Sequence, residues 1–257
     1  MLTTPARHIL CAGVWLASAL GYPASLQAAG LAISPVVVEV NSPRKSVAIT
    51  VTNDSDRALT FQTDTMVWRQ VNGLDQYEPT DELLVVPPIV EIAPNASQLF
   101  RVTLRVPVDS PVERTYRLIL EDITEASAVA EEGSVAFKFV HNLPVMVAPA
   151  GKIVNALRWK PCALNTASTP LKPSAARTPQ ACVLVYNAGN RRVKIQTLTL
   201  TGDGWEQVLQ LKAGENVLAG AEREWRVPLQ PGQTGAVRGV QTQTARGETL
   251  QAEAGGF

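Results

Sequence analysis

Side chains that most catalytic and metal sites require are scarce in this sequence. It contains two histidines and three cysteines among 257 residues, and only 5% of the residues are aromatic. A Ser-His-Asp triad needs a histidine base beside its nucleophile, and His141 is the only histidine outside the N-terminal segment. The sequence also lacks a glycine-rich phosphate loop and any CxxC or HExxH motif. We therefore expect no enzyme activity, no metal and no cofactor.

An excess of charge of either sign is also missing. The 23 basic and 23 acidic residues give a formal net charge of zero at pH 7. Binding to nucleic acid favours a basic surface, and so does attachment to an anionic membrane surface. We therefore expect neither as a main partner. The composition, 46% hydrophobic and 18% charged, is that of a folded protein, and the length suits two domains of about 100–120 residues.

The N-terminus has the pattern of a cleaved secretory signal peptide. A basic start precedes the apolar stretch 11–24, which is followed by small residues up to Ala28 and Ala29. The apolar stretch is too short for a transmembrane anchor, and Cys11 begins the stretch, whereas a lipid-acceptor cysteine follows it. We expect residues 1–29 to be removed on export, without insertion of the mature chain into the membrane.

Two cysteines remain after this cleavage, Cys162 and Cys182. An even pair in an exported protein predicts one disulfide. The segment between them is rich in Pro, Ser, Thr and Ala, and we interpret it as a long surface loop closed at its base by this bond.

Apolar residues recur at every second position through most of the chain, as in 47–51, 100–106 and 116–120. This alternation is typical of β-strands that bury one face. Turn-forming residues such as Asn72–Gly73 separate these segments, and only 217–224 could form a helix, which would be short. Short strands at intervals of about 8–12 residues predict an all-β fold built of β-sandwiches.

The segment 145–152 ends a strand and carries Pro149 and Gly151. We interpret it as a hinge, because domain boundaries often contain such residues. The chain is therefore predicted to form an N-terminal domain over 30–149 and a C-terminal domain over 150–257.

The strand that leads into this hinge has a continuous apolar row on one face, formed by Val135, Phe137 and Phe139. Pro144 has no N–H to donate, which favours an edge strand or a bulge. From periodicity alone, the simpler interpretation is that the row fills the domain's own core. The alternative is that it contacts a partner.

Several local patterns follow one another in a distinctive order along the mature chain. Their key residues are Pro87, Pro88, Pro94, Gln98 and Arg101, then Glu113, Tyr116, Arg117 and Leu118, and finally Asn187, Gly189, Asn190, Gly220, Arg223 and Trp225. The set resembles the PapD-like periplasmic pilus chaperones of chaperone–usher systems. The sequence LPV at 143–145 is most similar to the archaic branch, of the spore-coat-protein-U type.

The resemblance implies two immunoglobulin-like β-sandwich domains and a mechanism. Pilins of this class lack their last strand, and the chaperone lends them its own by strand addition. Carried over by position, the lent side chains are Val135, Phe137 and Phe139, which reverses the interpretation from periodicity. The implied partners are pilin subunits and an outer-membrane usher, and the implied compartment is the periplasm.

One departure concerns the carboxylate at the end of the pilin. The classical branch of the family binds it with an Arg and a Lys in the cleft between domains, but those positions here hold Val37 and Pro144. Neither side chain can bind a carboxylate, so the anchor has either moved or is absent. Because arginine can bind a carboxylate through two hydrogen bonds, we expect the anchor at Arg117 or Arg101. The side chains of His141 and Asn142 are further candidates.

Two other functions are considered. A structural or adhesive fimbrial subunit should carry an N-terminal donor extension, and no free alternating segment precedes Leu31. An exported ligand-binding β-sandwich would usually display several aromatics at its loop tips. The free chaperone could also form a homo-oligomer by covering its own exposed edge.

Overall fold

The computed structural model describes residues 30–41, 44–124, 139–162, 180–233 and 236–257. These ranges contain strands and no helix, so the all-β prediction is confirmed and nothing in them is a helix that could cross a membrane. The short helix predicted over 217–224 is wrong. The chain turns there instead, with Gly220 at positive φ and a hydrogen bond from Ala221 N to Leu218 O. The predicted signal peptide lies outside the described residues.

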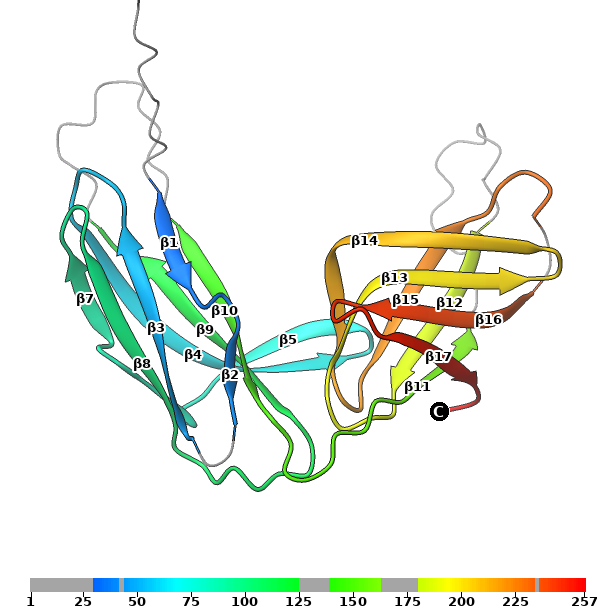
Figure 1. Ribbon diagram of the computed structural model, residues 1–257, viewed down its shortest axis with the longest axis horizontal. Coiled ribbons are helices and arrows are strands. Elements are labelled where there is room, and N and C mark those ends of the chain that lie inside the picture. Colours follow the sequence, from blue (N-terminus) through cyan, green and yellow to red (C-terminus); the bar gives the residue numbers. More distant parts are fainter. Residues whose placement is uncertain (1–29, 42–43, 125–138, 163–179, 234–235) are drawn as a thin grey trace, which may run out of the picture.

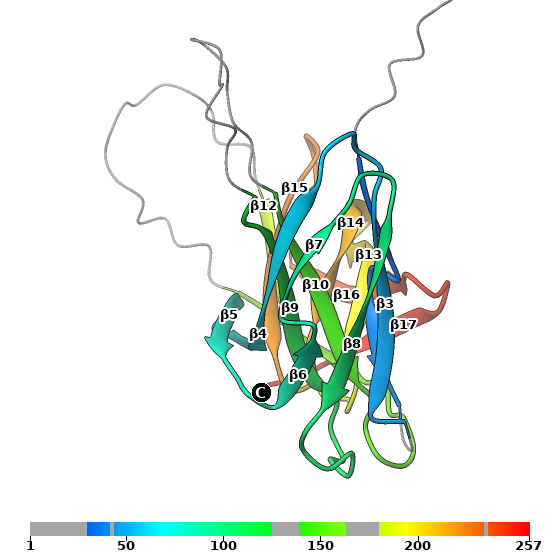
Figure 2. The ribbon, with the colours of Figure 1, turned by 90° about the vertical axis from the view of Figure 1, so that its left-hand side faces the viewer.

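Within the described residues, ten strands form the first sandwich, which has two sheets (Figures 1 and 2). One sheet has the order β1 (Leu31–Ser34), β3 (Ser46–Asn53), β8 (Ser97–Leu104) and β6 (Leu83–Val86). The other has the order β2 (Val38–Val40), β10 (Val140–Val147), β9 (Arg114–Asp122), β4 (Leu59–Val71) and β5 (Leu74–Pro79), with β7 (Ile89–Ile92) also paired to β4.

The alternation of apolar residues along the strands explains which faces of the two sheets pack against each other. Ile49 of β3 and Phe100 of β8 are fully buried, and they belong to one core cluster with Leu118 and Leu120 of β9. Burial of each such side chain stabilises the fold by roughly 1.5–3 kcal/mol. The core therefore lies between the two sheets, and the alternate residues form the outer faces.

Seven strands of the described part of the chain form the second sandwich, around a separate core cluster. Their order is β14 (Trp205–Val217), β13 (Val193–Gly202), β16 (Val237–Thr244), β17 (Thr249–Ala254), β11 (Leu157–Pro161), β12 (Gln180–Asn187) and β15 (Glu222–Pro228). Strand β17 pairs with β16 through its first part and with β11 through Glu253 and Ala254. It thereby joins the two layers of this sandwich.

Each sandwich contains one fully buried asparagine at the end of a strand. The Nδ2 group of Asn53 donates to Ile92 O at 3.0 Å, and that of Asn187 donates to Val217 O at 2.9 Å. A buried carbonyl without such a donor would cost free energy. Each Nδ2 group also donates to a carbonyl of the segment that leaves its strand, Arg57 O at 2.7 Å and Arg191 O at 2.8 Å, so both domains fix this segment in the same way.

The predicted disulfide between Cys162 and Cys182 is confirmed. The two Cα atoms are 5.2 Å apart, and Cys162 N also donates to Cys182 O. The bond joins the end of β11 to β12, which are neighbours in the sheet.

We expect the double variant Cys162→Ser with Cys182→Ser to lose roughly 3 kcal/mol of unfolding free energy, because a loop spanning 20 residues is no longer closed in the unfolded chain. Urea unfolding of the oxidised protein and the variant measures this. A reductant should destabilise the parent protein by a similar amount and leave the variant unchanged. Equal stability of the oxidised parent and the variant would contradict the expectation.

Candidate functional site

One edge of β10 is only partly covered. Strand β9 pairs with β10 along its whole length, from Val140 to Val147, whereas β2 pairs in parallel only with Val145–Val147. Across the described ranges, no strand pairs with Val140–Pro144 on that side. We call these five residues the open edge. Unpaired N–H and C=O groups of this kind are a template for another strand.

Phe139 stands at the start of the open edge. Its side chain is 56% exposed, whereas Leu143 and Val145, which share its face of the strand, are buried in the first core. Phe139 therefore extends the core-facing row of Leu143 and Val145 to a position where the side chain is exposed to solvent. Val135 and Phe137, the other members of the predicted row, lie outside the described residues.

The first core is accessible beside this position. A mostly apolar cavity of about 420 Å³ lies at the β1 and β10 side of the sandwich, lined by Leu31, Leu59, Phe61, Phe139 and His141. The ring of His141 stacks on that of Phe139, with centroids 6.4 Å apart. Burial lowers the pKa of His141, and no described group is a hydrogen-bond partner of its Nε2 atom.

Arg117 lies against aromatic rings on the outer face of the sheet that contains β10. Its guanidinium carbon is 3.8 Å from the ring centroid of Trp68 and 5.7 Å from that of Tyr77. Burial lowers the pKa of Arg117, and its Nε atom is buried without a hydrogen-bond partner among the described groups. A cation over an aromatic face is attracted by the ring quadrupole.

The other predicted anchor residues do not join Arg117 in one site. Arg101 is exposed on β8, in the opposite sheet. His141 lines the cavity on the core side of β10, while Asn142 is exposed on the other face of that strand. Of these residues, only Asn142 shares the outer face of the sheet with Arg117.

A buried carboxylate links the two sandwiches. The Glu113 side chain is 2% exposed, and it accepts hydrogen bonds from Arg192 N at 2.8 Å and Arg192 Nη1 at 2.6 Å. Arg191 Nε is 3.6 Å away. Burial raises the pKa of Glu113, although the charges of both arginines act in the opposite direction.

The hairpin of β4 and β5 forms a second link. It turns at Asn72 and Gly73, as the sequence predicts, and extends to the second sandwich (Figure 1). Gln70 Oε1 accepts a hydrogen bond from Leu218 N at 2.9 Å, and Asp75 lies 3.5 Å from Arg223. A small apolar cluster lies beneath these contacts, formed by Trp68, Met146, Leu218 and Ala221, with Val37 packed against it.

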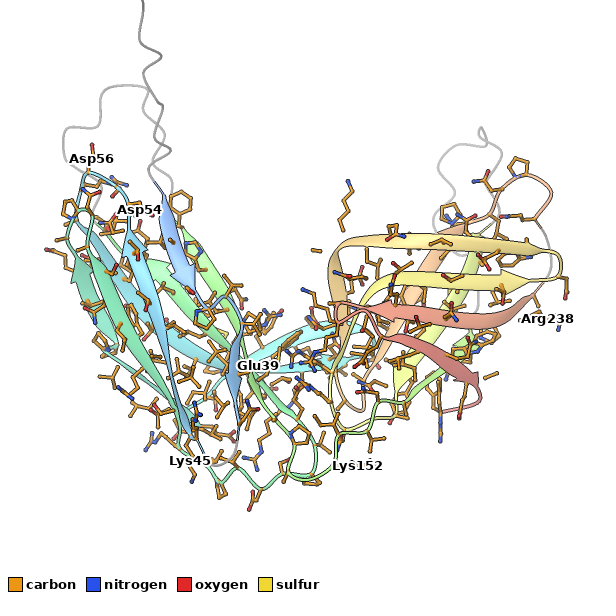
Figure 3. The ribbon with its side chains drawn as sticks, viewed as in Figure 1. Glu39, Lys45, Asp54, Asp56, Lys152 and Arg238 are labelled. Carbon is orange, nitrogen blue, oxygen red and sulfur yellow. A yellow bond between two sulfur atoms is a disulfide. The ribbon has the colours of Figure 1, made fainter. Side chains whose placement is uncertain are left out.

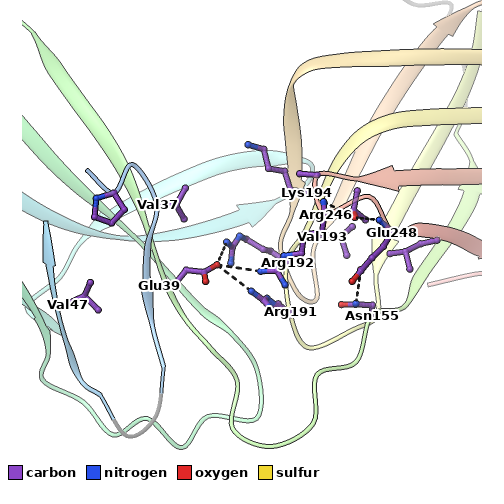
Figure 4. A pocket seen from close by; sticks show the side chains of 14 residues that line it. Val37, Glu39, Val47, Asn155, Arg191, Arg192, Val193, Lys194, Arg246 and Glu248 are labelled. Carbon is purple, nitrogen blue, oxygen red and sulfur yellow. Dashed lines mark hydrogen bonds and ion pairs between the residues drawn. The ribbon is translucent and has the colours of Figure 1, made fainter. Parts of the chain in front are cut away.

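A cleft of about 470 Å³ separates the two sandwiches beside these links (Figure 4). Its wall in the first domain is formed by Pro35, Val37, Glu39 and Val47. Its wall in the second domain carries four cations, Arg191, Arg192, Lys194 and Arg246, with Asn155, Val193, Thr244, Ala245, Glu248 and Leu250. No sequence motif marks these cations as site residues, although the adjacent arginines after the 187–190 turn are a visible signal.

The first sandwich matches a family model, and both sandwiches are similar in fold to solved structures. Residues 30–152 match the family model described as pili and flagellar-assembly chaperone, PapD N-terminal domain. No curated protein matches the chain.

Solved structures are similar in fold. A chain of the CsuC–CsuE chaperone–tip adhesion subunit pre-assembly complex, from the archaic chaperone-usher Csu pili of Acinetobacter baumannii, is 16% identical with a TM-score of 0.64, covering 89% of this chain and 100% of that one. The E. coli chaperone DraB is 19% identical (TM-score 0.53; 88% and 96% covered). A chain of the Salmonella enterica SafA pilin complex with the SafB chaperone is 12% identical (TM-score 0.54; 87% and 96% covered).

The raised pKa of Glu113 predicts a definite pH dependence. A carboxyl whose pKa rises on folding binds its proton more tightly in the folded state, so its contribution to stability is largest below the unfolded pKa near 4.5 and falls as pH rises through the folded pKa. Relative to Glu113→Gln, the parent protein should therefore lose unfolding free energy between pH 4 and pH 7. Urea unfolding across this range measures the difference, and a gain with rising pH would contradict it.

Arg117→Ala should lower the unfolding free energy by about 1 kcal/mol, because the stacking on Trp68 is lost, and should change Trp68 fluorescence. Arg101→Ala is the matched control, since Arg101 is exposed on the other sheet and should leave both measurements unchanged. If Arg117→Ala unfolds like the control, the stacking does not stabilise the fold.

Proposed function

Because residues 30–152 place the chain in the family of pili and flagellar-assembly chaperones with a PapD N-terminal domain, we propose that the protein binds unfinished pilus subunits by donor-strand complementation. It holds them in the periplasm and delivers them to an outer-membrane usher. This role is non-enzymatic, and its partners are proteins rather than nucleic acid or lipid.

The open edge of β10 is the observation that supports this proposal most strongly. Val140–Pro144 offer unpaired backbone groups, and Phe139 exposes an apolar ring at the start of this edge. A subunit that lacks a strand has the complementary defect, an open groove and an unpaired edge of its own. Strand addition satisfies the backbone groups of both chains at once.

The side chains proposed to enter the subunit's groove are Val135, Phe137 and Phe139. Burial of each is worth roughly 1.5–3 kcal/mol, reduced by the cost of ordering the strand. Main-chain hydrogen bonds demand little of the partner's sequence, so the apolar row supplies most of the selectivity for subunits with a hydrophobic groove. In the absence of a subunit, the same edge of a second chaperone could cover the row in a homo-oligomer.

Two of the similar structures support the choice of partner. One is a complex of a chaperone with a tip adhesion subunit, and the other a complex of a chaperone with a pilin. Their shared fold with this chain favours the chaperone over a fimbrial subunit or an exported ligand-binding module. The anchor for the subunit's carboxylate stays a prediction at Arg117 or Arg101, with His141 and Asn142 as lesser candidates.

The donor-strand proposal predicts that Phe139→Asp combined with Phe137→Asp lowers recovery of a co-expressed pilin at least tenfold, because charged groups would have to enter an apolar groove. Co-purification of the co-expressed pilin with the chaperone measures the recovery. Leu99→Asp is the matched control, since Leu99 is 48% exposed on the opposite sheet and should leave capture unchanged. Normal capture by the Phe137 and Phe139 variant would show that another surface binds the subunit.

A further inference from the structure

The cavity beside Phe139 contains a buried acidic side chain that the proposed function does not use. Asp122, the last residue of β9, lines this cavity and is only 4% exposed. It lies opposite Phe61 in the register of β4 and β9, and its backbone N donates to Phe139 O at 2.9 Å. Side chains of residues opposite each other on neighbouring strands share one face of the sheet. The carboxylate therefore lies between two phenylalanine side chains on the core face.

The charge of this carboxylate is not neutralised by the described part of the chain. Its Oδ1 atom accepts a hydrogen bond from Thr124 N at 2.9 Å. No described group donates to its Oδ2 atom, and no described basic side chain forms an ion pair with Asp122. Burial of an ionised carboxylate without a counter-ion is unfavourable. Asp122 therefore favours a positively charged occupant of the cavity.

The other polar residues of the cavity leave this negative charge in place. Asp56 and Arg57 are exposed residues of opposite charge that also line the cavity. Asp54 and Asp56 both lie at this end of the first sandwich (Figure 3). Burial lowers the pKa of His141 below its usual value, so the imidazole is uncharged at pH 7 and does not repel a cation. One negative charge, that of Asp122, remains.

We propose that this cavity binds a small organic ammonium ion, with its charged group at Asp122 and its apolar body against Phe61 and Phe139. The site goes beyond the proposed function and does not depend on it. Ammonium N–H groups form charge-assisted hydrogen bonds to a carboxylate, and the face of an aromatic ring attracts a cation. Leu31 and Leu59 complete the apolar wall, which strengthens the charge interaction by lowering the local dielectric constant.

The size of the cavity suits a ligand of this class. Its volume of about 420 Å³ lies within the range of small-molecule sites, about 300–1,000 Å³. The lining also predicts selectivity between ligands of similar shape. A neutral analogue leaves the Asp122 carboxylate without a counter-ion, and an anionic analogue is repelled by it.

Three probes that share a phenyl ring test this selectivity: 2-phenylethylamine, the neutral 2-phenylethanol and the anionic 3-phenylpropionate. Isothermal titration of the full chain at pH 7 measures their affinities. We expect the amine to bind at least tenfold more tightly than the alcohol, and the anion not to bind. In Asp122→Asn, the affinity for the amine should fall to that for the alcohol, which should itself be unchanged. Equal affinities of the parent protein for amine and alcohol would overturn the inference.

Asp54→Asn is the matched control. It removes one negative charge at the same end of the sandwich (Figure 3), and Asp54 is exposed and does not line the cavity. This variant should bind the amine like the parent protein. If it weakens binding as much as Asp122→Asn does, the attraction comes from the general charge of this end and the inference is wrong.

A measurement on the parent protein covers the case in which Asp122→Asn does not fold. Titration with 2-phenylethylamine should shift the NMR signals of the Phe61 and Phe139 ring protons. Shifts confined to residues outside the cavity would place the amine elsewhere and overturn the inference.

The chain's own α-ammonium group is the competing occupant, because Gly30 also lines the cavity. Acetylation of the amino terminus distinguishes the two sources of the ammonium group. Amine binding that is the same before and after acetylation supports a site for a free ligand. Amine binding that appears only after acetylation would show that the chain's own amino group fills the cavity, and the inference would be wrong.

Discussion

The arrangement depends on one short crossing, in which the chain leaves the first sheet at Ser34 and joins the second at Val38. Because β2 begins so late, it covers only three residues of β10 and leaves the rest of that edge unpaired. The same crossing leaves a mostly apolar cavity between β1 and β10 and brings Val37 to the cleft. An unpaired edge, an accessible core and the rim of the cleft all follow from where the chain changes sheets.

The contact between the domains combines a buried charge, whose loss of hydration is unfavourable, with hydrogen bonds and apolar packing, which are favourable. Burying the carboxylate of Glu113 is unfavourable in itself, and its pairing with Arg192 offsets only part of the lost hydration, because the pKa of Glu113 stays raised. A buried pair of this kind is weak evidence for added stability. The hairpin of β4 and β5 and the small cluster around Trp68 and Leu218 add apolar burial and hydrogen bonds on another side of the contact.

Features encoded by neighbouring residues could be predicted from the sequence, whereas the cleft could not. Alternation of apolar residues identified the strands, and Asn72–Gly73 identified a turn, which the structure shows to join the β4–β5 hairpin. The segment 217–224 was misinterpreted as a possible helix because the turn at Gly220 leaves too few residues to show a period of two. Arg101 and Arg117 both point outward, as alternation implies, but only the pairing of strands reveals that they lie on opposite sheets. Glu39, Arg191 and Arg246 are far apart in the sequence, and only the packing of the two domains brings them together.

The two-sided contact between the domains has a consequence for the length of the chain segment that can be held. Glu113 with Arg192 and Gln70 with Leu218 fix the second domain relative to β10. A strand advances about 3.3 Å per residue, and a shift by one residue turns its side chains to the opposite face. A strand added to the open edge whose end also contacted the cleft wall would therefore have its alignment along β10 fixed as well. The pair of domains would then accept only one register of that strand.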